Sequence, residues 1–309
     1  MATCALYHEE RELRDSHIVP KFAFDYLKRT SATGFLRFSN RPNLRVQDGR
    51  KVPLLCSACE LRFSTLEKYF AERVFQPYLK DRGSTIRDDG RLLKFAASLS
   101  WRVLFYYNAH GHLDEVPAHH LPQIDAALEE WRLFLLDQTD HPGRFEHHLL
   151  PMDEVSSSTV PDMPTAMNRY ILRSIDMDVV TSEKTALVYT KLPSIAVVGF
   201  VEMRYPRSRW QGTRIAARDG TIMPRQYVIP QAFGEYVMGK ARIGQEALAG
   251  MSAVQKELVK RGAGKSRPRR EIRVYKSNNG GCKTLWQSCI YRTCRRGVDK
   301  TGGSALRAA

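Results

Sequence analysis

Four side chains near the start of the sequence have the types and spacing of a metal site. Cys56 and Cys59 form a Cys-x-x-Cys pair, whose thiolates can share one tetrahedral zinc ion across a tight turn. Cys4 and His8 lie four residues apart and offer a thiolate and an imidazole for the other half of the site. We therefore expect Cys4, His8, Cys56 and Cys59 to bind a structural Zn²⁺. Two alternatives stay open, buried free thiols without a metal and a redox pair, although a redox pair normally lies in a βαβ pattern.

A second motif lies between the two halves of this predicted zinc site. It reads Ser16-His17-Ile18-Val19-Pro20, and Leu-Cys-x-x-Cys-Glu follows at 55–60. Over residues 1–70 the chain resembles the HNH, or ββα-metal, endonucleases of the Cys-rich type. It is also similar to uncharacterised bacterial proteins that share the Ser-His-Ile-x-Pro motif. The first resemblance implies two strands and a helix held by zinc, with a histidine base and a divalent ion acting on a phosphodiester.

The resemblance assigns roles to individual positions. His17 matches the general base, and Glu60 falls where a metal-binding histidine would be, so that Glu60 could hold a catalytic Mg²⁺ or Mn²⁺. Ser16 stands where the family has a metal-binding aspartate, and Lys51 near the asparagine that orients the histidine. These departures leave two alternatives: a scaffold that binds without cleaving, and a His17 that is a core residue bonded to a backbone carbonyl.

Positive charge is concentrated in two parts of the chain. The formal net charge is +15, of which residues 260–309 contribute +12 from 14 Lys/Arg and 2 Asp/Glu. The second basic part follows the Ser-His-Ile-x-Pro motif and also contains Phe35 and Phe38. Arginines that contact phosphates beside aromatic rings that stack on bases are typical of nucleic-acid binding. We expect nucleic-acid contacts from Arg37, Arg41, Arg45 and Lys51. The C-terminal tail could bind a polyanion or be a solvated extension.

Length and composition exclude several classes of protein. A chain of 309 residues suggests about two domains. It has no run of 18 apolar residues and no N-terminal pattern of a secretory signal, so we expect a cytoplasmic protein without a membrane span. Phosphate-binding Walker loops, dinucleotide-binding glycine patterns and Gly-x-Ser-x-Gly elbows are absent from the sequence.

Hydrophobic periodicity predicts the elements that must position these residues. A helix is expected over 64–78, with Ser64 and Glu67 as its capping box. Further helices are expected over 92–106, 117–137, 167–174 and 231–260, the last with weak points at Gly244 and Gly250. Strands are expected over 178–182, 186–192, 194–202, 213–217 and 221–229, with Asp219-Gly220 as a hairpin turn between the last two.

These elements predict an α+β fold. A zinc-supported ββα module at 1–82 leads into a helical region at 83–150, and a linker at 151–165 is followed by a mostly antiparallel sheet with a closing helix at 166–260. A basic tail occupies 261–309. We expect a zinc protein that acts on nucleic acid, with Mg²⁺- or Mn²⁺-dependent endonuclease activity as the specific form considered. The alternatives are an inactive HNH-like scaffold that binds nucleic acid or protein, and another enzyme with its site in 166–259.

Overall fold

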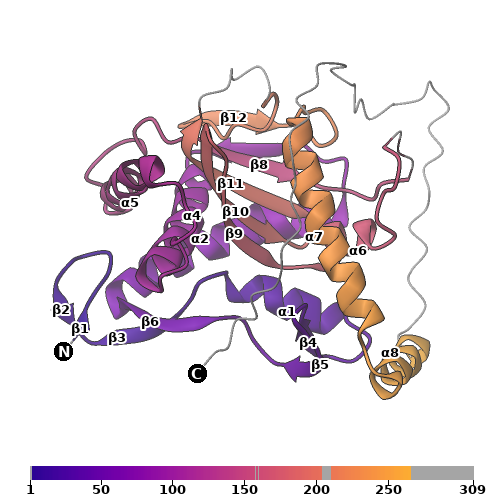
Figure 1. Ribbon diagram of the computed structural model, residues 1–309. Helices are drawn as coiled ribbons and strands as arrows, with labels where there is room; N and C mark the ends of the chain where they lie inside the picture. Colours follow the sequence, from indigo (N-terminus) through magenta and orange to yellow (C-terminus); the bar gives the residue numbers. More distant parts are fainter. Residues whose placement is uncertain (1, 157, 159, 204–209, 266–309) are drawn as a thin grey trace.

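The computed structural model describes residues 2–156, 158, 160–203 and 210–265. They form a mixed structure of helices and antiparallel sheets, as the α+β prediction requires (Figure 1). The expected basic tail at 261–309 lies mostly outside the described residues, as do Cys282, Cys289 and Cys294. In the described ranges, no helix combines the length and the apolar character needed to cross a membrane.

The N-terminal part consists of two-stranded sheets and short helices. Its strand pairs are β1 (Ala2–Thr3) with β2 (Glu10–Arg11), β3 (Leu13–His17) with β6 (Lys51–Cys56), and β4 (Leu36–Phe38) with β5 (Arg41–Val46). Helix α1 (Lys21–Thr30) lies between β3 and β4, and α2 (Ser57–Phe70) follows β6 directly. The chain therefore contains a strand–strand–helix unit, β3–β6–α2, around the residues that the sequence analysis selected.

Helix α2 begins seven residues earlier than the capping box predicts. Its N-cap is Cys56, and the Ser64 hydroxyl donates to the Leu61 carbonyl inside the helix instead of capping it. The helix continues through the π-helical turn η1 (Ala71–Phe75) into α3 (Gln76–Lys80). The capping-box prediction was wrong because the Cys-x-x-Cys turn itself starts the helix, which places Cys59 and Glu60 in its first turn.

A central helix joins this N-terminal part to the rest of the molecule. Helix α4 (Arg91–Ala109) contacts α2, α5 and the large sheet, and it is buried on nearly all sides. A helix enclosed in this way can be apolar around most of its circumference. The helix η2–α5 (Ala118–His120, Leu121–Leu135) packs beside it, and Trp101 and Trp131 are core residues.

The large sheet has four antiparallel strands in the order β8-β11-β10-β9. Their bounds are β8 (His147–Pro151), β9 (Asp176–Thr181), β10 (Thr185–Leu192) and β11 (Ile195–Met203). Alternate residues of β10 point to opposite faces: Val188 belongs to the core shared with α4, and Tyr189 to the core shared with α6 (Met167–Arg173) and α7 (Gln231–Ala249). Helices thus cover both faces, which confirms the three predicted strands between 178 and 202 and the covering helix (Figure 1).

The predicted hairpin around Asp219-Gly220 does not form. Strand β12 (Asp219–Ile222) pairs instead with β7 (Ile86–Asp89), so that Gly220 lies opposite Asp88. A Cβ atom on Gly220 would come within 2.6 Å of the Cβ of Ala216. The glycine therefore permits a close approach of two chain segments, which the sequence pattern does not distinguish from a turn.

The C-terminal helix is broken at one of the two predicted weak points. Helix α7 ends at Gly250 and α8 (Ala253–Lys265) follows, whereas Gly244 stays within α7. The predicted domain boundaries stay predictions, although β8 crosses the one at 150/151 and α8 the one at 260/261. One hydrophobic core extends from Cys4 to Ile222, so the N-terminal part and the sheet share packing.

Candidate metal centre and histidine site

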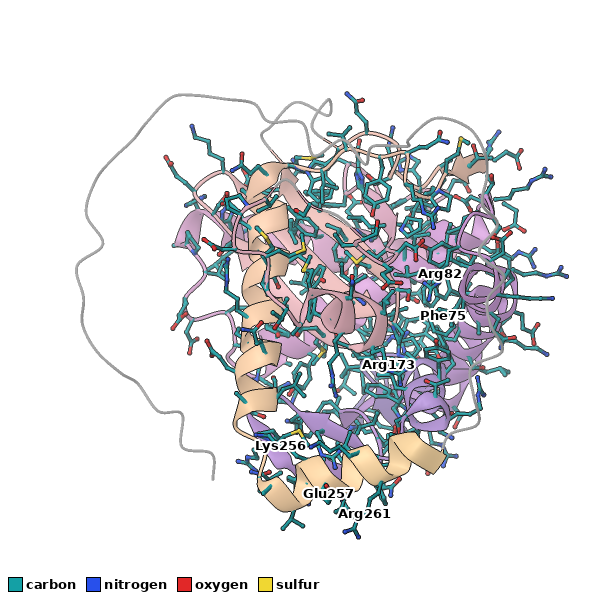
Figure 2. The ribbon with its side chains drawn as sticks, turned by 90° about the vertical axis from the view of Figure 1, so that its right-hand side faces the viewer. Phe75, Arg82, Arg173, Lys256, Glu257 and Arg261 are labelled. Atoms are coloured by element: carbon teal, nitrogen blue, oxygen red, sulfur yellow. The ribbon has the colours of Figure 1, made fainter. Side chains whose placement is uncertain are left out.

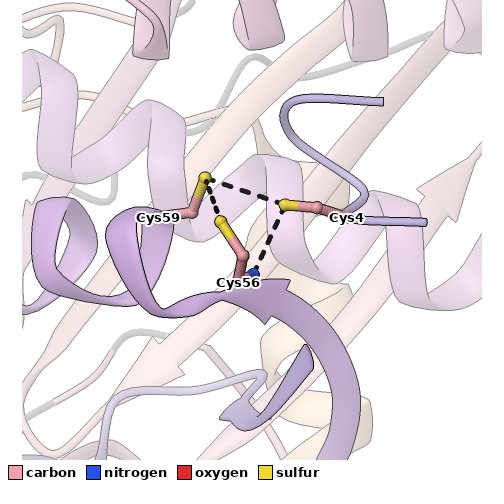
Figure 3. A group of neighbouring side chains, drawn as sticks. All are labelled: Cys4, Cys56 and Cys59. Atoms are coloured by element: carbon pink, nitrogen blue, oxygen red, sulfur yellow. Dashed lines mark hydrogen bonds between the residues drawn. The ribbon is translucent and has the colours of Figure 1, made fainter. Parts of the chain in front are cut away.

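Three cysteines from separate elements meet at one end of the β3–β6–α2 unit (Figure 3). Cys4 follows β1, Cys56 ends β6, and Cys59 lies in the first turn of α2. The turn after Cys4 is closed by two backbone hydrogen bonds of 2.8 Å, from Cys4 N–H to the Glu9 carbonyl and from His8 N–H to the Cys4 carbonyl. This turn fixes Cys4 against the start of the helix.

The sulfur atoms have the spacing of ligands to a single ion. The Sγ of Cys59 lies 3.7 Å from that of Cys4 and 3.6 Å from that of Cys56. A tetrahedral zinc ion with Zn–S bonds of about 2.3 Å would hold its sulfurs roughly 3.8 Å apart, whereas a disulfide joins them at about 2 Å. All three side chains are buried. The cluster could therefore hold a metal ion.

The local hydrogen bonds favour a thiolate at Cys56. The backbone N–H of Cys56 donates to Cys4 Sγ over 3.4 Å. Burial by itself would raise the pKa of the Cys56 thiol, but hydrogen bonds from Cys59, Cys4 and the Ala58 amide lower it overall. Burial raises the pKa of the Cys59 thiol, and the two neighbouring sulfurs raise it further. A cation between the neighbouring sulfurs would favour the thiolate forms of Cys56 and Cys59.

The structure does not bring the expected fourth ligand, His8, to the cysteines. Its backbone is left-handed, with φ of 60°, and its side chain is exposed. Among the described residues, the group that could hold an ion contains cysteine sulfurs alone. The spacing of four residues suggested a ligand pair, but the turn uses the backbone of His8 and leaves its imidazole in solvent.

His17 lies at the end of β3 and contacts a carboxylate. Its Nε2 is 3.0 Å from Oδ1 of Asp48, in the loop before β6. The Arg102 side chain of α4 donates to the His17 carbonyl over 3.0 Å and pairs with Glu67 of α2, which fixes the strand end. When a carboxylate holds one ring nitrogen of an imidazole, the other ring nitrogen can act as a general base.

Asp48 is fixed in turn by its neighbours. Lys51 pairs with its second oxygen over 2.7 Å, and the Gly49 amide donates to the first over 2.9 Å. Burial alone would raise the pKa of Asp48, but hydrogen bonds from Lys51, His17 and Gly49 lower it well below its usual value. A side chain at Gly49 would collide with the Phe24 ring, since its Cβ would lie 2.2 Å from that ring. Glycine next to Asp48 therefore lets the loop pack closely against the Phe24 ring.

Ser16 and Glu60 meet on the other face of β3. The hydroxyl of the fully buried Ser16 donates to Oε1 of Glu60, from the first turn of α2. Because consecutive strand residues point to opposite faces, Ser16 and His17 face different sides. The described hydrogen bonds and ion pairs do not join His17 to Glu60. The structure thus pairs the predicted base with Asp48 and the predicted ion ligand with Ser16.

The predicted nucleic-acid residues lie on and beside the β4–β5 hairpin. Arg41 and Arg45 are exposed, and the Arg45 guanidinium lies 5.0 Å from the centre of the Phe35 ring. Arg37 is half-buried and donates to Gln255 of α8 over 2.8 Å. Lys51 is exposed but is engaged with Asp48.

Asp48 is the site residue that the sequence analysis missed. It lies in the loop before β6, outside any motif, and only the pairing of His17 with Lys51 across β3 and β6 brings it to the imidazole. The position of Lys51 near the family's histidine-orienting residue was the available hint. Comparison with family models, with curated proteins and with solved structures finds no match.

Proposed function

We propose that this protein binds nucleic acid through a zinc-supported ββα unit of the HNH type. The observation that carries the proposal is the convergence of Cys4, Cys56 and Cys59 at one end of β3–β6–α2. The HNH resemblance leads us to expect a metal at this place, where the end of a strand, the start of a helix and an N-terminal turn need a common support.

Zinc is the ion that suits this donor set. Three buried thiols are soft ligands, which favour Zn²⁺, whereas Mg²⁺ and Ca²⁺ prefer oxygen. The role is structural because the sulfurs are buried and no described carboxylate or imidazole lies within ligand distance of them. A buried site of this kind contributes to folding, and three sulfurs leave the fourth position of a tetrahedral ion to another donor, such as water.

Nucleic acid is the partner that suits the neighbouring hairpin. Arg41 and Arg45 present charged tips to solvent, and Phe38 at the hairpin turn is 47% exposed. Guanidinium groups bind phosphates, and an exposed ring can stack on an unpaired base. The proposal therefore places the phosphate backbone along β4 and β5.

Phosphodiester hydrolysis is the second candidate function, and the His17–Asp48 pair is the observation that favours it. In that case His17 accepts the proton of the attacking water, and a Mg²⁺ or Mn²⁺ ion is needed at the phosphate. Glu60 lies on the opposite face of β3 from His17, which favours binding over cleavage.

Elemental analysis of the purified chain tests the metal, with titration of a labelled oligonucleotide as the second readout. We expect about one zinc per chain, loss of that zinc in Cys59→Ser, and retained zinc in Ser64→Ala on the same helix. A chain without zinc, or one that binds no single-stranded or duplex oligonucleotide at low salt, contradicts the proposal.

A plasmid-nicking assay with Mg²⁺ or Mn²⁺ distinguishes the two functions. If the protein cleaves, His17→Ala should reduce nicking about a hundredfold or more, while the exposed His119→Ala should leave it unchanged. Nicking that survives His17→Ala would exclude His17 as the base. Oligonucleotide binding without nicking in either metal would leave the binding function alone.

A further inference from the structure

Four arginines from distant parts of the sequence form a second basic feature, which we call the arginine cluster: Arg37 on β4, Arg45 on β5, and Arg169 and Arg173 on α6. β4 and β5 pair with Leu36 opposite Val46, so Arg37 and Arg45 lie in the same section of the hairpin. Arg169 and Arg173 are four residues apart on α6 and therefore share a face of that helix.

Contacts of the backbone bring the hairpin and α6 to the same part of the molecule. β5 and α6 both contact α7, and β4 contacts α1. Arg173 donates to the carbonyl and hydroxyl oxygens of Thr30, the last residue of α1, over 3.0 and 3.1 Å. Figure 2 views the molecule from this side and shows Arg173 above Lys256 and Arg261 of α8.

The arginine cluster lacks nearby negative charge. Among the described residues, none of its four members has a carboxylate within 4.0 Å. The acceptors that Arg37 and Arg173 do have, Gln255 and Thr30, are neutral. The Nε of Arg37 is buried and has no hydrogen-bond partner among the described residues. Donors and charge are therefore available for an anionic ligand.

Mutual repulsion within the arginine cluster supports this interpretation. Partial removal from water lowers the pKa of Arg169, and the charges of Arg173 and Arg37 lower it further. Desolvation and the charge of Arg45 lower the pKa of Arg37 in the same way. Like charges held together without counterions are stabilised when an anion binds between them.

We propose that the arginine cluster binds the phosphate backbone of a nucleic-acid strand, which thereby contacts both the β4–β5 hairpin and α6. This inference rests on the proposed function and extends it to a helix of the C-terminal half. A nucleic acid fits better than an isolated anion because Phe35 lies against Arg45, and the exposed Phe38 lies opposite Arg41 on the same hairpin, so that both offer rings for bases. Each bound phosphate would release counterions and make the affinity depend on salt.

The test measures binding of the full chain to a fluorescein-labelled 20-nucleotide single strand, as DNA and as RNA, by anisotropy over a series of salt concentrations. Divalent ions are left out so that no cleavage occurs. The Arg169→Gln/Arg173→Gln double variant should bind about tenfold more weakly, and the slope of log affinity against log salt should fall by about 1 to 2. The Arg169→Lys variant, which keeps the charge, should bind more tightly than Arg169→Gln.

Arg87→Gln is the matched control, because Arg87 is exposed on β7 and pairs across from Thr221 of β12, far from the hairpin in Figure 1. It should change neither affinity nor slope. An unfolding midpoint within about 2 °C of the wild type confirms that the double variant is folded although it loses the hydrogen bonds from Arg173 to Thr30.

Three results would overturn the inference: equal affinity of the double variant and the wild type, equal weakening in Arg87→Gln, or binding of phosphatidylserine vesicles in preference to the oligonucleotide. Its failure differs from failure of the proposed function. If the wild type and the double variant bind the oligonucleotide equally well, only the role of the arginine cluster is excluded. If the wild type binds no oligonucleotide, the proposed nucleic-acid binding is excluded as well.

Discussion

Residues 2–56 and the four-stranded sheet are stabilised in different ways. In residues 2–56 every strand pairs with a single neighbour, and the strands have two to six residues. The large sheet has four strands of five to nine residues, and helices cover both of its faces. A two-stranded ribbon is at best marginally stable alone, whereas a covered sheet buries enough apolar surface to be stable.

The sulfur cluster lies between the two-stranded ribbons and helix α2. Cys4 follows β1 and Cys56 ends β6, both in short two-stranded ribbons, and Cys59 is on α2, which packs through Phe63 against Trp101 of α4. The cysteines thus connect the ribbons to a helix that is already anchored in the main core. If zinc has a structural role, its removal should affect residues 2–56 far more than the sheet.

Replacing Cys59 by Ser gives the largest expected effect. Loss of one of three thiolates should destabilise residues 2–56 by more than about 4 kcal/mol, because metal binding and folding are coupled at such sites. Hydrogen exchange measured by mass spectrometry should show lost protection in β1 to β6 and retained protection in β10 and β11. A chelator should reproduce this pattern in the wild type.

Ile195→Ala is the matched perturbation of the sheet. Ile195 is fully buried on β11, so the truncation should cost about 2–5 kcal/mol of global stability. That cost should be the same with and without chelator. Equal loss of protection throughout the chain in both variants would show that the two regions unfold together, and the comparison would then fail.

The two regions also differ in how well the sequence predicts them. The strands at 176–203 are recognisable because runs of Val, Ile, Tyr and Thr specify a sheet buried on both faces. The Cys-x-x-Cys pair is recognisable because its chemistry depends on local spacing. Residues that become neighbours only through folding are not recognisable: Asp48 at His17, Asp88 opposite Gly220, and Arg173 of α6 at Thr30 of α1.

The wrong predictions share a physical cause. Ser64 and Glu67 fit a capping box, but the Cys-x-x-Cys turn starts the helix at Ser57 and overrides it. Asp219-Gly220 fits a hairpin turn, but the local pattern does not contain the close packing with Ala216. In each case a feature outside the short motif decided the local structure.

Replacing Asp88 should have an intermediate effect on stability. Asp88 lies on β7, which pairs with the distant strand β12. It is 5% exposed, and burial raises the pKa of its carboxyl to about 6. A raised carboxyl pKa means that the folded state binds the proton more tightly than the unfolded state. Stability is therefore lost as the pH rises from about 4 through 6.

Asp88→Asn should remove the loss of stability that occurs as the pH rises. The variant should be more stable than the wild type by about 1–3 kcal/mol at pH 8 and nearly equal at pH 4 in urea unfolding. The neighbouring Asp89→Asn is the control with the opposite sign, since the hydrogen bond from Arg91 lowers the pKa of Asp89 to about 2. A wild type that equals Asp88→Asn at both pH values would contradict the prediction.

Asp48→Asn gives the smallest expected change in stability and bears on the N-terminal region. Asp48 is partly exposed, so its contacts with Lys51 and His17 should contribute only about 1 kcal/mol or less at pH 7. Because its pKa is lowered in the folded state, that contribution is present above about pH 4 and is lost as the pH falls below it. Urea unfolding at pH 7 and pH 3 measures the difference.

The same variant separates a structural role of the His17–Asp48 pair from a chemical one. A structural role predicts that affinity for oligonucleotide and any nicking activity change no more than the small loss of stability allows. A chemical role predicts that nicking falls at least tenfold while stability and affinity change little, because the imidazole loses the carboxylate that orients it. A large loss of stability, above about 2 kcal/mol, would instead show that this ion pair is a main structural support of residues 2–56.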